Sequence, residues 1–453
     1  MCMKKSVVLA VMLLLGVKAI CHADEGSEAL ANKLAEKGII TYGEAQTLVT
    51  ESQEEARKNL ANASIVTLPA WIQNISMSGD LRLRSQSDWN SANFYERVRD
   101  RVRLRMNLDT RLSECYKAGF GFATGSESID STTDELGNAT VGKGNVIDAN
   151  SGSANSTFSG FGRLPVELNL AFIEYDPAIP NVTTAITVGK MRQGTQVWNA
   201  TDLLWESSLN PDGAAISMNY KINGQMTVGL IASLLSINNL NSAVSNPTAS
   251  IGEVTYTWDT DDYKVKLGVA QQNLDVYGKN CGTYFGDSAG VPLMLNATGG
   301  AIAGAYIDYF VMSESFELTW KNAFCANNIA VVGDMAANSF SPNAPATISD
   351  ENASCYGVKI GAGSVAGFGQ WQLVYLSRTL GGNAWLNKLG ANDPYGAAHN
   401  ETGSQEQINL GLSKALTVAF TYYDYDLLEK TAAQKVAGNT KQDIFQADLI
   451  YKF

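Results

Sequence analysis

The sequence predicts an all-β protein, an antiparallel transmembrane β-barrel of about 16 strands preceded by a short N-terminal helical segment. Three observations predict this fold class. Segments after Ala70 alternate apolar and polar residues with a period of two, tight and long connections alternate between these segments, and the last segment ends on the aromatic residue Phe453. Strands cross a membrane only as a closed barrel, because every backbone polar group must be hydrogen-bonded in lipid.

The N-terminus carries the pattern of a secretory signal peptide. Two lysines precede an apolar run at residues 7–17, and a small-residue site follows at Ala23. The run is too short to span a bilayer as a helix. We therefore expect residues 1–23 to be a signal peptide that is cleaved after Ala23. Acylation of Cys21 is the alternative, which Ile20 disfavours because a small residue is wanted at that position.

Residues 24–70 are predicted to form a periplasmic helical segment. Apolar residues recur at helical spacing among Glu, Lys and Gln in residues 27–63. Gly38, and Thr41 followed by Glu44 at capping-box spacing, divide the pattern into two short helices. We expect an appendage that packs or oligomerises, with peptidoglycan binding or trimerisation as the alternative.

Residues 71–453 are predicted to form an outer-membrane barrel. The candidate strands, which are even in number, are 73–87, 97–112, 116–126, 165–177, 183–193, 213–222, 225–237, 250–259, 263–276, 305–322, 328–338, 354–363, 368–379, 405–413, 416–428 and 441–453. Tight links alternate with long ones, of which the longest are 128–164, 277–304 and 380–404. Short periplasmic turns and long extracellular loops are the usual layout of such barrels.

The last candidate strand carries the most specific signal in the chain. Leu449, Tyr451 and Phe453 share one face of this strand, and polar residues share the other. An aromatic terminal residue with Tyr two positions earlier resembles the signature by which outer-membrane barrels are recognised for assembly. We therefore expect the barrel assembly machinery and outer-membrane lipid as partners.

An arginine ladder runs along the first two candidate strands. Its members alternate with apolar residues and are Arg82, Arg84, Arg97, Arg99, Arg101, Arg103 and Arg105. One arginine at the middle of the lipid face costs about 2–4 kcal/mol, so the ladder must face an aqueous lumen. Two interpretations stay open. Either the arginines form a basic wall that sets a transverse field against acidic groups on an infolded loop, or they pair with Glu167, Asp80 and neighbouring carboxylates to stabilise the wall.

Three groups of residues carry a resemblance to a known family. They are Leu34 to Thr41 with Glu44 and Ala45, the arginine-rich opening strands, and Leu204-Trp205-Glu206-Ser207 leading to Asn210-Pro211-Asp212-Gly213. With them the chain resembles the putative porin family of Gram-negative bacteria, in which a signal peptide and a short helical segment precede a porin-type barrel. The resemblance covers essentially the whole mature chain. It implies passive diffusion of small solutes and names no substrate.

The link from Gly194 to Asp212 is the candidate constriction loop. Its apolar residues suit the inside of a barrel, and its acidic residues would face the basic wall; the candidates are Trp198, Asp202, Trp205, Glu206 and Asp212. The third external loop of general-diffusion porins folds inward in the same place. A short helix that starts near Thr201 and caps the extracellular mouth, or packs on a neighbouring subunit, is the alternative.

Four cysteines remain after Ala23, namely Cys115, Cys281, Cys325 and Cys355. Bridged Cα atoms must lie within about 7 Å, which rules out bonds across the membrane thickness. Cys281 and Cys355 both fall at the external end and are the candidate disulfide. Cys115 and Cys325 fall in turns that are distant around the rim, and free thiols are the alternative for all four.

Composition and motifs exclude several other classes of protein. A formal net charge of −12 argues against nucleic acid as a partner. His399 is the only histidine after Ala23, and GxxxxGK[ST], HExxH and EF-hand patterns are absent from the sequence. We therefore expect no enzyme, no metal site and no cofactor.

We expect an outer-membrane porin through which small hydrophilic solutes or ions diffuse passively. A structural barrel with a plugged lumen, used as an anchor or adhesin, is the alternative, and an outer-membrane hydrolase ranks below both. Small solutes and further copies of the chain in a homotrimer complete the expected partners.

Overall fold

The computed structural model describes most of the chain from Asn74 onward. The described ranges are 74–90, 95–125, 132–135, 166–237, 246–276, 309–325, 327–339, 350–386, 388–391, 399–430 and 440–453, together with Lys37, Thr41, Glu44, Thr47, Asp393 and Lys435. The chain divides into two units, Met1–Gln73 and Asn74–Phe453. The second unit contains all of the strands.

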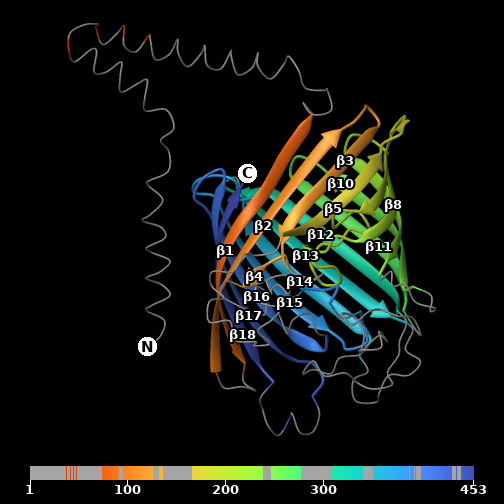
Figure 1. Cartoon of the computed structure of the whole chain (residues 1–453). Coiled ribbons are helices and arrows are strands. Elements are labelled where there is room, and N and C mark those ends of the chain that lie inside the picture. Colours follow the sequence, from red (N-terminus) through yellow and green to blue (C-terminus); the bar gives the residue numbers. More distant parts are fainter. Residues whose placement is uncertain are drawn as a thin grey trace, which may run out of the picture. The chain divides into compact units, whose positions relative to one another are not determined.

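Sixteen long antiparallel strands form one closed barrel (Figure 1). They are β1 (Ile75–Asn90), β2 (Tyr95–Arg111), β3 (Tyr116–Thr124), β5 (Val166–Tyr175), β7 (Val182–Lys190), β8 (Asp212–Lys221), β9 (Met226–Ser236), β10 (Thr248–Asp259), β11 (Tyr263–Asp275), β12 (Tyr309–Phe324), β13 (Asn327–Asn338), β14 (Asn352–Gly361), β15 (Trp371–Leu380), β16 (Glu401–Gly411), β17 (Leu416–Leu427) and β18 (Gln442–Lys452). β1 pairs with β2 on one side and with β18 on the other, which closes the ring.

The predicted strands are confirmed, since each of the sixteen overlaps one long strand of the barrel. Two further strands of only two residues were missed: β4 (Asp134–Glu135) and β6 (Ala178–Ile179). β4 pairs with β2 from within a link that was predicted to be a loop, and β6 lies in a predicted turn. Two residues are too few to show a period of two.

Apolar side chains cover the outer face of the barrel wall and polar side chains cover its inner face, which is the reverse of their distribution in a water-soluble protein. On β1 the exposed residues include Leu81 and Leu83, at 36% and 39%, whereas Arg84 and Gln86 are 8% and 1% exposed. Successive side chains of a strand point to opposite faces, so apolar residues cover the outside and polar residues fill the inside. This alternation is the pattern of a transmembrane barrel.

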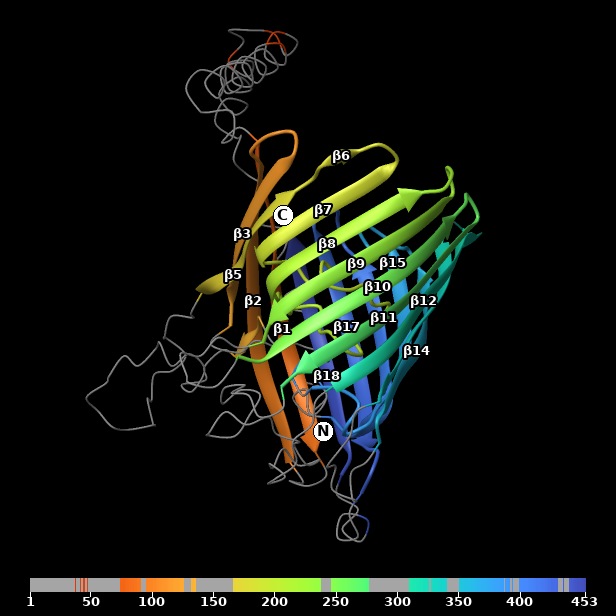
Figure 2. The same ribbon diagram turned by 90° about the vertical axis from the view of Figure 1, so that its right-hand side faces the viewer.

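Tight turns lie together at one rim of the barrel (Figure 2). Backbone hydrogen bonds join several of these turns to the neighbouring stretch of chain. Asp176 donates its backbone N–H to Cys115 O, and Lys452 donates to Ala415 O, both at 2.7 Å. The other links leave from the opposite rim and are longer, except for the four-residue link 91–94 between β1 and β2. The predicted alternation of short and long connections is therefore confirmed.

The chain end closes the barrel against a glycine. Phe453 and Gly79 exchange two backbone hydrogen bonds of 2.9 and 3.1 Å. A Cβ atom at Gly79 would lie 2.2 Å from Arg105 O and 2.7 Å from the Phe453 ring. Only glycine therefore fits at this crossing of the first, second and last strands.

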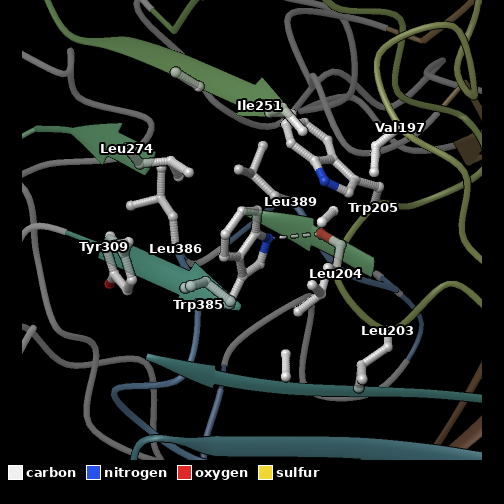
Figure 3. Packing of buried hydrophobic residues seen from close by; sticks show 14 of the residues in the cluster. Val197, Leu203, Leu204, Trp205, Ile251, Leu274, Tyr309, Trp385, Leu386 and Leu389 are labelled. Carbon is white, nitrogen blue, oxygen red and sulfur yellow. Dashed lines mark hydrogen bonds between the residues drawn. The ribbon is translucent and has the colours of Figure 1, made fainter. Parts of the chain in front are cut away.

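The largest apolar cluster lies inside the barrel unit and not on its wall alone (Figure 3). Two inter-strand links supply Leu204, Trp205, Trp385 and Leu386, which pack with strand residues such as Leu274. These links are residues 191–211, between β7 and β8, and residues 381–400, between β15 and β16. We call them loop 191–211 and loop 381–400.

In the N-terminal unit the predicted capping box between Thr41 and Glu44 is present. Thr41 N donates to Glu44 Oε2 at 2.8 Å, and Glu44 N donates to Thr41 Oγ1 at 3.3 Å. The hydrogen bonds from the backbone and hydroxyl of Thr41 lower the pKa of Glu44. The signal peptide and the remainder of the helical prediction for 24–70 lie outside the described residues. No helix among the described residues has the length and apolarity needed to cross a membrane.

Candidate functional site: the luminal arginine wall and two inner loops

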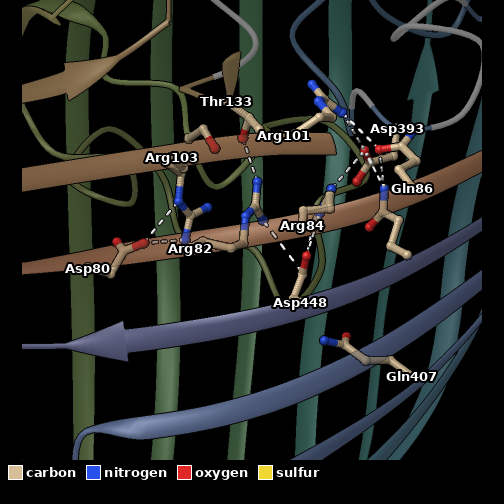
Figure 4. Close-up of polar contacts among 12 residues, drawn as sticks. Asp80, Arg82, Arg84, Gln86, Arg101, Arg103, Thr133, Asp393, Gln407 and Asp448 are labelled. Atoms are coloured by element: carbon tan, nitrogen blue, oxygen red, sulfur yellow. Dashed lines mark hydrogen bonds and ion pairs between the residues drawn. The ribbon is translucent and has the colours of Figure 1, made fainter. Parts of the chain in front are cut away.

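The register of the first two strands stacks the arginines inside the barrel. Arg82 lies opposite Arg103, and Arg84 lies opposite Arg101. Their neighbours Leu81 and Leu83 are exposed on the outside, so the guanidinium groups point inward (Figure 4). We call the seven predicted arginines of β1 and β2 the arginine wall.

Carboxylates partner most of the arginine wall. Arg84 makes a bidentate pair with Asp448 of β18, with Nε–Oδ1 at 2.7 Å and Nη2–Oδ2 at 2.9 Å. Asp80 bridges Arg103 and Arg105, each at 2.6 Å. A carboxylate can accept hydrogen bonds from two guanidinium groups, one on each oxygen, or from one guanidinium group that binds both oxygens. A few acidic residues can therefore pair with a larger number of arginines.

Two further members of the arginine wall have partners of their own. Arg99 pairs with Asp88 at 2.5 Å. Arg82 donates to Thr133 Oγ1 at 2.5 Å and lies 4.0 Å from Asp448. Glu167 of β5, which was predicted as a partner of the arginines, instead lies opposite Ala123 of β3.

Loop 191–211 is attached to strands across the interior. Asp334 of β13 accepts the backbone N–H of Ala200 at 3.0 Å and of Thr201 at 2.6 Å. Glu253 of β10 accepts the N–H of Trp198 at 2.8 Å. Asp334 and Glu253 are both buried, so the loop crosses the lumen to reach them.

Side chains of the loop add further attachments. Trp205 Nε1 donates to Gln272 Oε1 of β11 at 2.8 Å, and the ammonium of Lys266 lies 4.0 Å from the centroid of the Trp198 ring. The second contact is a cation–π interaction. No helix starts at Thr201 in the described loop, where the chain follows a series of bends. The amide and hydroxyl of Thr201 both donate to Asp334.

Four of the five predicted loop residues lie on the loop, and one does not. Trp198, Asp202, Trp205 and Glu206 belong to loop 191–211. The Asp202 side chain is exposed to the lumen, where the surrounding protein partly desolvates its carboxyl and raises its pKa. Asp212 is instead the first residue of β8, where it is exposed and pairs with Lys190 at 3.4 Å. Its place at the strand end follows from the ladder of β8 with β7, which begins at this residue.

Loop 381–400 is a second inner loop that the sequence analysis missed. Trp385 Nε1 donates to Leu204 O at 2.7 Å, and its ring meets the edge of Trp205 at 5.6 Å between centroids. Glu206 N donates to Leu389 O at 2.7 Å. Trp385, with Leu386 and Leu389 after it, was the available signal, since three large apolar residues are unusual in a Gly- and Asn-rich external loop.

The far part of this loop reaches the arginine wall through Asp393. Its Oδ1 accepts from Gln446 Nε2 at 2.8 Å and from Arg84 Nη1 at 3.4 Å, and its Oδ2 accepts from Tyr423 OH at 3.2 Å. Arg101 Nη1 lies 4.0 Å from Oδ1. Burial opposes ionisation of this carboxyl, but the guanidinium groups of Arg84 and Arg101 hold its pKa below the usual value.

Buried polar groups fix the base of the same loop. Arg378 Nη2 and Glu401 Oε1 form an ion pair of 3.1 Å with both side chains almost fully buried. His399 is also buried, and this burial together with the charge of Arg378 lowers its pKa to about 3. The imidazole is therefore neutral at pH 7.

A polar cavity of about 550 Å³ lies between the arginine wall and loop 191–211, and Ala391 and Asp393 of loop 381–400 also line it. Arg82, Arg84, Arg101 and Arg103 line one side of it. A row of linked amides lines β15 and β16, where Gln405 donates to Gln407 at 3.4 Å and Gln407 donates to Asn409 at 3.0 Å. The cavity offers charged donors on one side and neutral hydrogen-bonding groups on another.

The described cysteines form no disulfide with one another. Cys115, Cys325 and Cys355 are free, and Cys355 is buried on β14, where its side chain lines the luminal cavity. Cys281, its predicted partner, lies outside the described residues, so the pairing stays a prediction. Among the described residues there is also no cluster of His, Cys, Asp and Glu that would hold a metal ion.

Comparison with known proteins finds one matching family model and solved porin structures of low similarity. A search of the curated proteins finds no match. A triple mutant of the Rhodopseudomonas blastica porin is similar over 84% of this chain and 100% of that chain, with 11% identity and a TM-score of 0.40. Another mutant of the same porin is similar over the same shares, with 11% identity and a TM-score of 0.39. The sequence model of the family described as "Putative porin" matches residues 90–263, which confirms over that region the resemblance that the sequence indicated.

Proposed function

We propose that this chain is an outer-membrane porin through which small hydrophilic solutes and ions diffuse passively along an arginine-lined wall. The observation that carries the proposal is the inverted wall, apolar outside and polar inside, around a cavity of about 550 Å³. An apolar exterior requires lipid, and a charged interior requires water. A channel for polar solutes needs both.

The charges around the cavity support a constriction formed by the arginine wall and loop 191–211. Asp202 and Glu206 of the loop line the cavity together with Arg82, Arg101 and Arg103. Charges of opposite sign on facing walls set a transverse field, which orders solutes and tunes ion selectivity. We infer that these residues determine which solutes pass most readily.

Planar-bilayer recording of the purified, refolded chain tests the proposal. We expect stepwise current increases in potassium chloride as single barrels insert. Detergent without protein and a heat-unfolded sample serve as controls. Insertion without step currents, with insertion verified by co-flotation with liposomes, refutes the porin function.

A plugged structural barrel is the second candidate, favoured by the apolar cluster that the two inner loops place inside the barrel. Trp385, Leu386, Leu203 and Leu204 are almost completely buried there. Buried apolar residues fill the barrel on the side of loop 191–211, while the polar cavity lies on the side of the arginine wall. The same recordings separate the two candidates, because a plug that fills both sides conducts no ions.

We also propose the cellular context that the sequence indicated. Residues 1–23 direct secretion, residues 24–70 form a periplasmic helical appendage, and Leu449, Tyr451 and Phe453 are the signal for the barrel assembly machinery. The outward positions of Tyr451 and Phe453, which are both exposed, support contact with lipid or with that machinery. N-terminal sequencing of the outer-membrane form tests cleavage after Ala23, and its mass in detergent tests the homotrimer.

A further inference from the structure

Three hydrogen-bond donors and one further guanidinium group, from four different strands, surround the carboxylate of Asp393. Arg84 of β1, Tyr423 of β17 and Gln446 of β18 donate to it, and the guanidinium group of Arg101 of β2 lies 4.0 Å away, where it donates to Gln86 (Figure 4). The strands hold these donors independently of loop 381–400, because each belongs to the hydrogen-bonded wall. The carboxylate therefore sits in a pocket that the barrel itself builds.

The chemistry of the pocket suits a carboxylate. An ionised carboxylate accepts about four hydrogen bonds and donates none. Both guanidinium groups can only donate, and the amide of Gln446 and the phenol of Tyr423 both point their donors at Asp393. The donors reach both oxygens, so the pocket matches a planar, two-oxygen anion better than a spherical one.

Charge balance points to an anion with one negative charge. Three guanidinium groups, those of Arg82, Arg84 and Arg101, face two carboxylates, Asp448 and Asp393. Asp448 is fixed to the wall by its bidentate pair with Arg84. Without Asp393 one more positive charge would be left uncompensated in a largely buried place, and a monocarboxylate would restore the balance.

We propose that Arg84, Arg101, Tyr423 and Gln446 form a binding site for the carboxylate of a small organic acid, and that Asp393 occupies this site as a tethered competitor. The inference rests on the proposed function, because a solute reaches the site through the lumen. The adjoining cavity leaves room for the rest of the acid, and the amide row of Gln405 and Gln407 offers partners for its polar groups. Solute carboxylates would then compete with Asp393 for the same donors.

The test is calorimetric titration of the refolded full chain in detergent with acetate, and with acetamide as its neutral counterpart. Asp393→Ala vacates the site and should bind acetate at least tenfold more tightly than the unaltered chain, while acetamide binds neither. Asp259→Ala is the matched control, since this carboxylate lies exposed beside Lys321 at the end of β10. It should behave as the unaltered chain does.

A second variant locates the binding. Adding Arg101→Gln to Asp393→Ala should abolish the gain in acetate affinity, and Tyr423→Phe in the same background should reduce it, with the β-sheet circular dichroism unchanged. Equal acetate binding by Asp393→Ala and the unaltered chain, or a gain that survives Arg101→Gln, would overturn the site. Calorimetry needs no ion flow, so step currents without acetate binding refute this site alone, and binding without step currents refutes only the porin function.

Discussion

Replacing Trp385 with alanine tests whether the two inner loops hold each other in place. The Trp385 side chain is completely buried, and it contacts Trp205 and Tyr309 through ring edges at 5.6 and 6.3 Å. Its indole N–H also satisfies Leu204 O of loop 191–211. The substitution therefore removes both apolar packing and the hydrogen bond between the loops.

The expected cost follows from these contacts. Truncating a buried tryptophan to alanine costs about 3–5 kcal/mol, and leaving a buried carbonyl without its donor adds about 1–3 kcal/mol unless water replaces it. A loss of about 4 kcal/mol shifts the equilibrium between docked and undocked loop 381–400 by roughly a thousandfold. Because undocking opens the lumen, single-channel conductance should rise.

Hydrogen exchange measures the docking directly. The N–H of Ala391 bonds to Asp202 O, and the N–H of Glu206 bonds to Leu389 O, so both amides should lose protection in Trp385→Ala. Trp320→Ala is the matched control, because Trp320 is 48% exposed on the outer face and should change neither conductance nor these amides. Unchanged protection of Ala391 and Glu206 in Trp385→Ala would refute the reasoning.

Three further predictions concern charge, pH and closure. Replacing Arg101 and Arg103 with alanine should shift selectivity toward cations, because the luminal wall loses two positive charges; a reversal potential in a salt gradient that does not move contradicts the basic-wall interpretation. The pKa of His399 is about 3 in the folded protein, below the value of about 6.5 in the unfolded chain. The neutral imidazole therefore contributes its full share of loop stability above pH 6.5. As the pH falls below 6.5, this contribution is lost by about 1.4 kcal/mol per pH unit. The protection factors of the loop amides, which correct for the slower intrinsic exchange at lower pH, should thus fall between pH 6.5 and 5, and His399→Gln should abolish that fall. Gly79→Ala should lower the yield of folded barrel, since its Cβ would clash with Arg105 O and the Phe453 ring; refolding yields equal to those of Gly224→Ala, where a Cβ meets no atom, would contradict this closure.

Local patterns were sufficient to predict the barrel wall. A period of two assigns each residue of a strand to one face, so the inward direction of Arg101 and the outward direction of Tyr451 required no knowledge of their neighbours. The capping box of Thr41 and Glu44 is equally local, since its residues are three positions apart. The predicted strand boundaries differ from the observed ones by a few residues, because the end of a strand depends on how far its partner strand extends.

Only the tertiary structure decided what the arginines contact and what fills the lumen. Arg84 meets Asp448 and Asp393 across 364 and 309 positions of sequence, and no periodicity relates residues so far apart. The docking of Trp385 on Leu204 is likewise set by the shape of the space that the closed strands enclose. The sequence by itself thus determined the wall and its two faces, because alternation is a property of each strand, whereas the inner loops and the site at Asp393 exist only once the ring of strands has closed.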